Sequence, residues 1–280
     1  MLRTTVLELY EVARSTLWVE DDLTRLFLTE VWSDQQIRVL TAGGRGGVEF
    51  LVAGAPRGRV GKGVVGLVDR DFSPDNRASW GNSDARILRT PAHEFENLLL
   101  DFDVLSALSG EARATIEEAA TARAASIKWW MACKTARYEI FGALAAHFPA
   151  EPPAAGMDQH AVTDHLVNSS YWREHRLALA SYTPQYVAQR VAQISADYDA
   201  HLASGEWVRS FSGKEIFRHV RAEIRGLVVH AKGGSPAEND ENLAVLIARE
   251  LRKPAFTSSP TAQLFREMRA ALRARAGLPP

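Results

Sequence analysis

Residues 64–72 read VVGLVDRDF, an apolar run that ends in Asp69 and Asp71. A short run of this kind, rich in valine and bounded by polar turn formers, predicts a buried β-strand. Side chains two positions apart on an extended strand share a face, so both carboxylates can converge on one spot. Ligands of open α/β sheets bind beyond the carboxyl ends of the strands. The stretch therefore predicts a buried strand that carries two acids to the functional edge of a sheet.

The first hundred residues alternate between strand-like and helix-like segments. Apolar runs predict strands at 15–20, 37–42, 64–69 and 85–89. Between them, 21–32 has a helical apolar period, 48–54 fits either a helix or a strand, and GGRGG at 43–47 predicts a turn. Thr90-Pro91 predicts the start of another helix, with Thr90 as its N-cap. The alternation predicts an α/β fold with a mainly parallel sheet covered by helices.

Helical patterns dominate the chain after about residue 103. Helix N-cap signals stand at Thr183, Ser212 and Ser235, and residues 265–277 predict a basic amphipathic helix. The stretch FPAEPPAAG at 148–156 predicts a linker or long loop. We therefore expect two domains, an α/β domain over 1–105 and a mostly α-helical domain over 106–280.

Composition narrows the classes of protein to which the chain can belong. Its 280 residues can bury a large core, and its net charge of −1 leaves nucleic-acid binding to a local patch. Cys133 is the single cysteine, so no internal disulfide forms and a reducing cytoplasm is the simplest setting. The N-terminal residues lack the apolar core of a signal peptide, and no run is long enough to span a membrane.

Acidic side chains follow three of the four predicted strands. Glu20 ends the first strand, Asp69 and Asp71 end the third, and Glu94 and Glu96 follow the fourth. Each acid alone is more often a solvated loop or helix-start residue, but their joint placement predicts a shared site. Carboxylates crowded at one edge repel each other unless a cation neutralises them. Oxygen ligands of this kind favour Mg²⁺ or Mn²⁺.

Several motifs together resemble those of the Toprim nucleases. They are WVEDD at 18–22, Gly43-Gly44, LVDRDF at 67–72, HEFENLLLD at 93–101 and SFSGKEIF at 210–217. The likeness is to the OLD-type (overcoming lysogenisation defect) branch and its stand-alone bacterial relatives, which lack an ATPase domain of their own. It implies a Toprim-like catalytic domain in which Glu20, Asp69, Asp71 and Glu96 bind the metal. It also implies a part in cleavage for Lys214.

The resemblance implies a function as well as a fold. It indicates a nuclease that hydrolyses phosphodiester bonds of DNA or RNA with Mg²⁺ or Mn²⁺, Glu96 serving as a metal ligand or general base. Cations near the acids, Arg45, Arg70 and Arg77, are candidates for substrate binding. Relatives of this kind work beside separate ABC-type ATPases in anti-phage defence, so such a partner is expected. The pattern is also compatible with a homodimer.

Two other functions stay open. Asp21 stands where the family often has glycine, and Thr24 stands near the place of a further acid, which favours a Toprim-like module that binds nucleic acid or a partner without cutting. A phosphotransferase with Asp69 as nucleophile ranks last, because no Ser or Thr partner is evident. GRVGKG at 58–63 resembles a P-loop only faintly and predicts a flexible turn.

Overall fold

The computed structural model describes most of the chain. The described residues are 15–55, 63–73, 80, 82, 84–141, 157–175, 177, 179–230 and 233–279. The predictions made for Arg77, for the linker at 148–156 and for the turn at 58–63 lie outside these residues, apart from Gly63 at the end of that turn. None of the described helices is long and apolar enough to cross a membrane.

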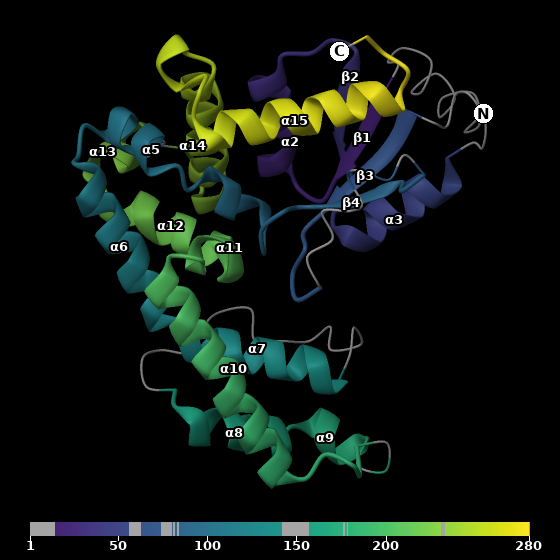
Figure 1. Ribbon diagram of the computed structural model, residues 1–280, viewed down its shortest axis with the longest axis vertical. Helices are drawn as coiled ribbons and strands as arrows, with labels where there is room; N and C mark the ends of the chain where they lie inside the picture. The colour runs from purple at the N-terminus through teal and green to yellow at the C-terminus, as the bar shows by residue number, and fades with distance from the viewer. Residues whose placement is uncertain are drawn as a thin grey trace.

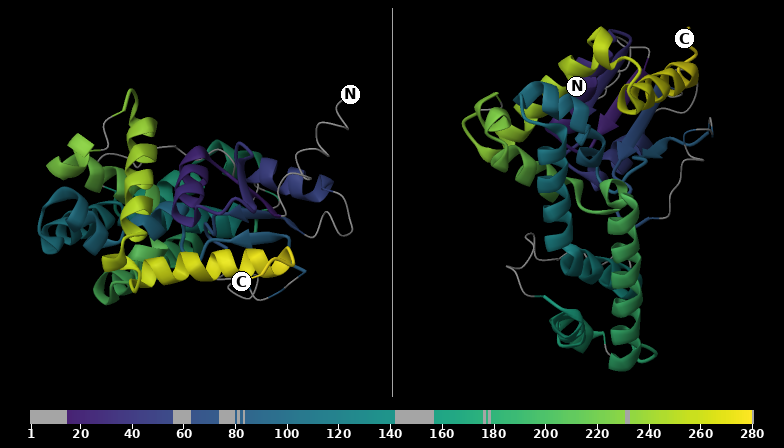
Figure 2. Two further views of the ribbon diagram at one scale, coloured as in Figure 1. Left: turned by 90° about the horizontal axis from the view of Figure 1, so that it is seen from above. Right: turned by 60° about the vertical axis from the view of Figure 1, so that its left-hand side comes forward.

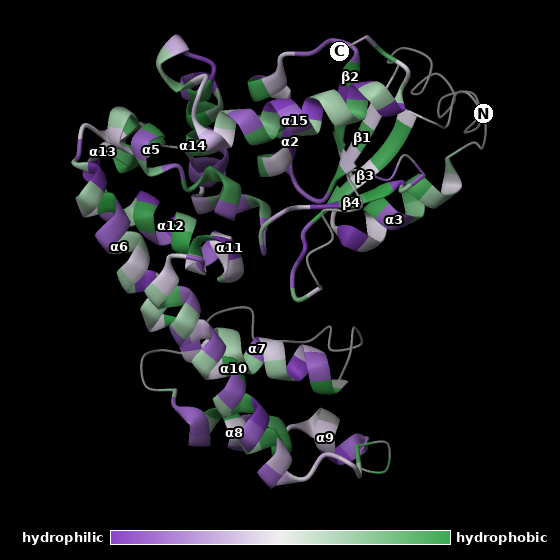
Figure 3. Cartoon of the chain, in the orientation of Figure 1, coloured by the Kyte–Doolittle hydropathy of each residue, from purple (hydrophilic) through white to green (hydrophobic). Residues whose placement is uncertain are grey.

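A sheet of four parallel strands forms the centre of the N-terminal part (Figure 1). Its order is β2-β1-β3-β4, and the bounds are β1 Ser15–Val19, β2 Ile37–Thr41, β3 Val64–Val68 and β4 Ile87–Arg89. Every residue of β1 and β3 is buried, because both faces of these central strands are covered. Figure 3 shows the strands as a hydrophobic centre among helices of mixed hydropathy. The α/β fold with a parallel sheet is confirmed.

Different helices cover the two faces of the sheet. On one face, α3 (Arg45–Gly54) packs Val48 and Val52 against β3. Gly66 permits this close approach, because a Cβ at that position would lie 2.3 Å from Val48 Cγ1. On the other face, α2 (Asp22–Trp32) joins the main core through Phe27. Side chains that alternate along β3 thus belong to two separate hydrophobic clusters, one on each face of the sheet.

Two local predictions about the start of a helix are wrong. In GGRGG, only Gly43 and Gly44 form the turn, with φ of 76° and 112°, and Arg45 already begins α3. Thr90-Pro91 starts no helix, because the Thr90 hydroxyl donates to Ala92 O and accepts from Arg70 N–H. Thr90 therefore fixes the loop after β3 rather than capping a helix.

Helices make up the rest of the described chain (Figures 1 and 2). Their bounds are η2 Phe95–Leu99, α5 Phe102–Ser109, α6 Arg113–Ser126, α7 Lys128–Phe141, α8 Gln159–Val167, α9 Ser170–Glu174, α10 Pro184–Ser204, α11 Trp207–Ser210, α12 Gly213–Glu223, α13 Arg225–His230, α14 Pro236–Leu251, η4 Pro254–Phe256 and α15 Pro260–Arg275. The N-caps predicted at Thr183, Ser212 and Ser235 are confirmed. Helices α7, α8 and α9 lie in an arm that extends away from the sheet along α10.

The C-terminal helices return to the sheet. Helix α14 packs along α2, and Phe265 of α15 enters the same core as Phe27. Asp34 accepts hydrogen bonds from Arg269 and Arg273, so these arginines of the basic helix hold α15 in place. The α/β segment and the helical segment share one core, and the division near residue 105 stays a prediction.

Candidate functional site

Glu20 and Asp69 meet at the carboxyl edge of the sheet. Glu20 follows β1, and its Oε1 accepts a hydrogen bond of 2.8 Å from the Asp69 N–H. Asp69 follows β3, and its Oδ1 accepts one of 2.8 Å from the Phe95 N–H at the start of η2. Among the described residues, nothing donates to the second oxygen of either carboxylate. These two acids therefore present free oxygens where three elements of the fold converge.

Asp71 lies in a turn and not on the extended strand, because β3 ends at Val68. Its φ of 49° is left-handed, a conformation that costs an L-residue about 1 kcal/mol. His93 holds this turn through two hydrogen bonds of 2.8 Å: its Nδ1–H donates to Asp71 O, and its carbonyl accepts from Asp71 N–H. The Asp71 carboxylate lies 3.7 Å from the Arg45 guanidinium, at the outer side of the site.

Glu96 lies deeper in the site. The residue is 4% exposed, and burial, with the carboxylates of Glu94 and Asp21 nearby, raises its pKa to about 8. Burial, with Glu96 and Glu20 nearby, likewise raises the pKa of Asp69 well above its usual range. These effects show that acids from three strand ends gather at one place. We call Glu20, Asp69, Asp71, Glu94 and Glu96 the acidic rim.

The donor set of the acidic rim fits a hard divalent cation. It offers only carboxylate oxygens, and the pKa values of Glu20, Asp69 and Glu96 are raised first by burial and then by the neighbouring acids. A pocket of about 10 Å³ touches Glu20, Asp69 and Thr90, a volume close to what one water molecule needs. No three His, Cys, Asp or Glu side chains in the described part of the chain are arranged as a ready metal-binding group. The fit is therefore one of charge and ligand chemistry.

The acids directly after Glu20 have structural partners. Asp21 caps α2 by accepting from the Thr24 N–H at 2.9 Å. Asp22 accepts from Arg25 and from the Thr41 hydroxyl, which holds it away from the acidic rim. Neither residue therefore adds a further free carboxylate to the acidic rim.

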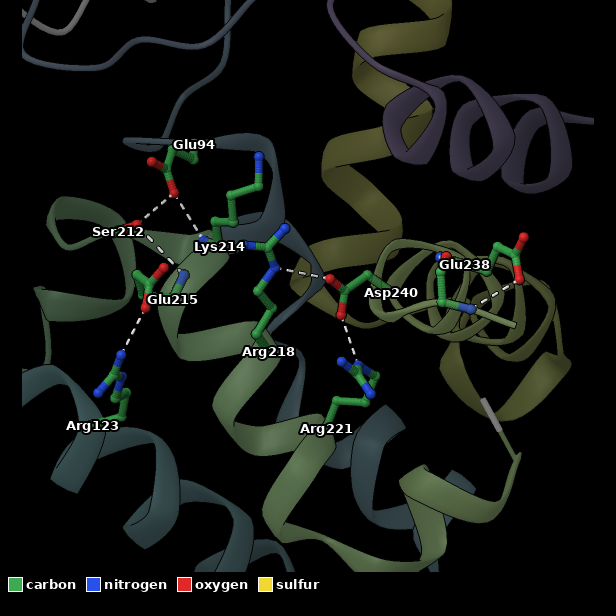
Figure 4. Close-up of polar contacts among 10 residues, drawn as sticks. Glu94, Arg123, Ser212, Lys214, Glu215, Arg218, Arg221, Glu238 and Asp240 are labelled. Carbon is green, nitrogen blue, oxygen red and sulfur yellow. Dashed lines mark hydrogen bonds and ion pairs between the residues drawn. The ribbon is translucent and has the colours of Figure 1, made fainter. Parts of the chain in front are cut away.

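Lys214 is joined to the acidic rim across 120 residues of chain. Glu94 Oε2 accepts hydrogen bonds of 2.8 Å from the Ser212 hydroxyl and from the Lys214 N–H (Figure 4). Figure 4 also shows the Lys214 side chain extending from α12 to the same side as Glu94. Burial disfavours the charged form of Glu94, yet His93, Lys134 and these two hydrogen bonds hold its pKa below the usual value. Glu94 is thus the link between the sheet edge and α12.

Asn97 and Gly213 complete this link. Asn97 Nδ2 donates to Val208 O and Phe211 O at 2.8 and 3.0 Å, which ties η2 to the segment before α12. Gly213 packs directly on Asn97, since a Cβ there would lie 2.4 Å from the Asn97 nitrogen. We call Glu94, Asn97, Ser212 and Gly213 the Glu94 clamp. Sequence reasoning identified Lys214 and Glu96 but missed the clamp, although E-x-E-N and S-G-K are its visible parts.

The three arginines expected to bind substrate have different surroundings. Arg45 stands beside the acidic rim, bonded to Glu49 and near Asp71. Arg70 donates to Arg209 O at 2.9 Å, so its guanidinium joins the turn Asp69-Arg70-Asp71, here called the D-x-D turn, to α11. Arg77 lies outside the described residues. Of the two that the structure describes, Arg45 has the position better suited to an anionic ligand.

Comparison with known proteins assigns neither a family nor a function to the chain. A comparison with protein-family models gives no match, and a search of curated proteins finds no similar sequence. Function has to be inferred from the residues of the site and their geometry.

Proposed function

We propose that the chain is a divalent-metal-dependent nuclease that hydrolyses phosphodiester bonds of DNA or RNA at the acidic rim. The observation that carries the proposal is the convergence of Glu20, Asp69 and Glu96, none of which forms an ion pair with an arginine or a lysine among the described residues. A fold tolerates such a cluster more easily when a bound cation relieves the repulsion. The resemblance to OLD-type Toprim nucleases at the same positions supports this proposal.

Each residue has a role that follows from its surroundings. Glu20, Asp69, Asp71 and Glu96 would hold Mg²⁺ or Mn²⁺ through their oxygens. When bound, such an ion supplies Lewis-acid stabilisation of phosphoryl oxygens and a more acidic water.

Two further roles fall to side chains around the metal ligands. Glu96 is also a candidate general base, because its pKa of about 8 in the metal-free chain makes its ionised carboxylate a stronger base than an ordinary glutamate, and a bound cation would favour that ionised form. Lys214, held beside Glu94, would stabilise negative charge developing on the phosphate.

The biological setting is proposed from the resemblance alone. Stand-alone relatives of this type work with a separate ABC-type ATPase, and we propose the same for this chain as a cytoplasmic anti-phage effector. A homodimer fits this proposal. Co-purification of the chain with the product of a neighbouring ATPase gene would test it, and a chain that cuts nucleic acid fully without any ATPase would count against it.

The decisive experiment compares two double variants. Asp69→Ala with Asp71→Ala removes two proposed ligands, whereas Asp103→Ala with Glu118→Ala removes two exposed acids on α5 and α6. Each protein is incubated with plasmid DNA and with tRNA in MgCl₂ and in EDTA. We expect cleavage only in MgCl₂, lost in the first variant and kept in the second. Equal cleavage by both variants would reject the site.

A binding module without cleavage is the second candidate. The engagement of Asp21 and Asp22 in α2 favours it, because no further acid follows Glu20 at the rim. Calorimetric titration with Mn²⁺ separates the two functions. A nuclease of the proposed kind gives heat that disappears in the Asp69→Ala, Asp71→Ala variant, and a degenerate site gives none.

A further inference from the structure

Helix α7 packs one of its faces on the D-x-D turn. Tyr138 lies with its ring centroid 5.5 Å from that of Phe72, the residue that follows Asp71. Phe72 in turn lies 4.8 Å from His93, which is hydrogen-bonded to Asp71. Lys134 precedes Tyr138 by one helical turn and so shares its face. The arm that carries α7 therefore borders the acidic rim.

The Lys134 ammonium is held by aromatic rings and not by a carboxylate. Its Nζ lies 4.3 Å from the ring centroid of Trp130 and 5.7 Å from that of Phe72. No carboxylate of the described residues forms an ion pair with it. Ring faces attract a cation but leave its net charge in place. The positive charge of Lys134 therefore remains available over Phe72, the residue that follows Asp71 of the acidic rim.

Lys128, at the start of the same helix, provides a contrast. Its Nζ also lies over an aromatic ring, 4.9 Å from the centroid of Trp129, but it pairs with Asp199 at 2.8 Å. One lysine of α7 is therefore neutralised by an ion pair within the arm, and the other forms no ion pair with a carboxylate of the described residues. The ion pair with Asp199 accounts for the charge of Lys128, whereas no ion pair among the described residues accounts for that of Lys134.

We propose that Lys134 is a phosphate-binding residue that grips the nucleic-acid backbone at a phosphate adjacent to the one cleaved. The inference rests on the proposed function for the identity of the ligand as nucleic acid. Lys134 from α7 lies over the ring of Phe72, the residue after Asp71, and Lys214 from α12 donates its N–H to Glu94, so both belong to the surroundings of the acidic rim. An anionic backbone held at the acidic rim would thus meet cations from two helices of the C-terminal part. Each would bind one phosphate as a point charge.

Binding without cleavage tests the proposal. The Asp69→Asn chain, full length, is titrated in MgCl₂ with a fluorescein-labelled single-stranded oligothymidylate, and anisotropy is followed at several KCl concentrations. In this background Lys134→Met keeps the apolar contact with the rings but removes the charge, and Lys134→Arg keeps the charge. Lys128→Met is the matched control on the same helix. Far-ultraviolet circular dichroism verifies that each variant is folded.

We expect Lys134→Met to weaken binding severalfold and to reduce the slope of log K against log [KCl] by about 0.7, the loss of one phosphate contact to a single strand. Lys134→Arg and Lys128→Met should leave both quantities close to those of the parent. An unchanged slope in Lys134→Met overturns the inference, as does an equal loss in Lys134→Arg or the absence of binding by the parent.

Cleavage by the chain with Asp69 intact is measured separately, so that the two proposals can fail independently. If the parent cleaves and Lys134→Met leaves the salt slope of binding unchanged, only the proposed phosphate contact of Lys134 is rejected. If Lys134→Met reduces the salt slope but the chain with Asp69 intact does not cleave, only the proposed hydrolysis is rejected.

Discussion

The fold contains two kinds of buried carboxylate, one paired with arginines and one without such a partner among the described residues. The side chain of Asp34 is 5% exposed and receives hydrogen bonds from Arg269 and Arg273, and that of Asp240, 6% exposed, is paired with Arg218 and Arg221. Glu96 is 4% exposed and pairs with no guanidinium among the described residues.

The difference shows in the pKa values. Burial disfavours ionisation of Asp34, but the Gln36 N–H and the two arginines hold its pKa below the usual value. At Glu96 burial and neighbouring acids act together, and the pKa rises to about 8. Asp34 stabilises the fold from within, whereas Glu96 has no such partner among the described residues and is neutralised by a proton or by a bound cation.

The largest expected effect is a difference in stability between matched amide variants. Asp34→Asn leaves Arg269 and Arg273 without their counter-charge and should lower the free energy of unfolding by about 3 kcal/mol. Glu96→Gln imitates the protonated acid and should leave stability at pH 7 unchanged or raise it. Urea unfolding followed by circular dichroism gives both values, with Asp103→Asn as the exposed control. Equal losses in the two variants would erase the distinction between the two kinds of carboxylate.

The Glu94 clamp should matter for catalysis through Lys214. Gly213→Ala forces a Cβ into Asn97 and displaces the first turn of α12, so kcat should fall by about a hundredfold. Gly54→Ala, where a Cβ meets nothing within 4 Å, is the control. In a Lys214→Ala background, Gly213→Ala should have no further effect on kcat, because the group it displaces is already gone. A full additional loss in the double variant would mean that the clamp does not act through Lys214.

The stability of the metal-free chain should depend on pH through Glu96. Its pKa is about 8 in the folded state and near 4.5 when unfolded, so the folded state binds more protons between these values. Stability is therefore greatest below pH 4.5 as far as Glu96 is concerned, and it declines as pH rises toward 8. From pH 6 to 8 the unfolding free energy should fall by about 2 kcal/mol. Glu96→Gln should flatten this slope in EDTA, and a slope unchanged by the substitution would refute the assignment.

Sequence patterns predicted the sheet because its strands are short apolar runs with both faces buried. The N-caps at Thr183, Ser212 and Ser235 were also predictable, since each depends on residues only three apart. Thr90 has the same local signature but serves a contact with Arg70, twenty residues away. Local patterns fail at such places because one hydroxyl can either cap a helix that follows it or bond a backbone group distant in sequence.

The candidate site shows the same limit more strongly. The strand-end rule placed Glu20 and Asp69 at one edge, as the structure has them, since it needs only strand order and direction. The contacts of Glu94 with Ser212 and Lys214 join residues 118 and 120 positions apart, so no spacing could have revealed them. Lys134 was overlooked for a similar reason, as its position beside Phe72 depends on how α7 folds back on the D-x-D turn.

The smallest expected effect is stabilisation by Mg²⁺. A ligand that binds only the folded chain raises the unfolding free energy by about 1.4 kcal/mol at ten times its Kd. Mg²⁺ should therefore raise the melting temperature of the parent, and more so at pH 8 than at pH 6, because deprotonated Glu96 attracts the ion more strongly. The gain should vanish in Glu20→Gln and persist in Asp34→Asn, whose carboxylate is already neutralised by arginine in the parent. If Glu20→Gln kept the full gain, the ion would be binding elsewhere, and the acidic rim would have to be stabilised by protonation alone.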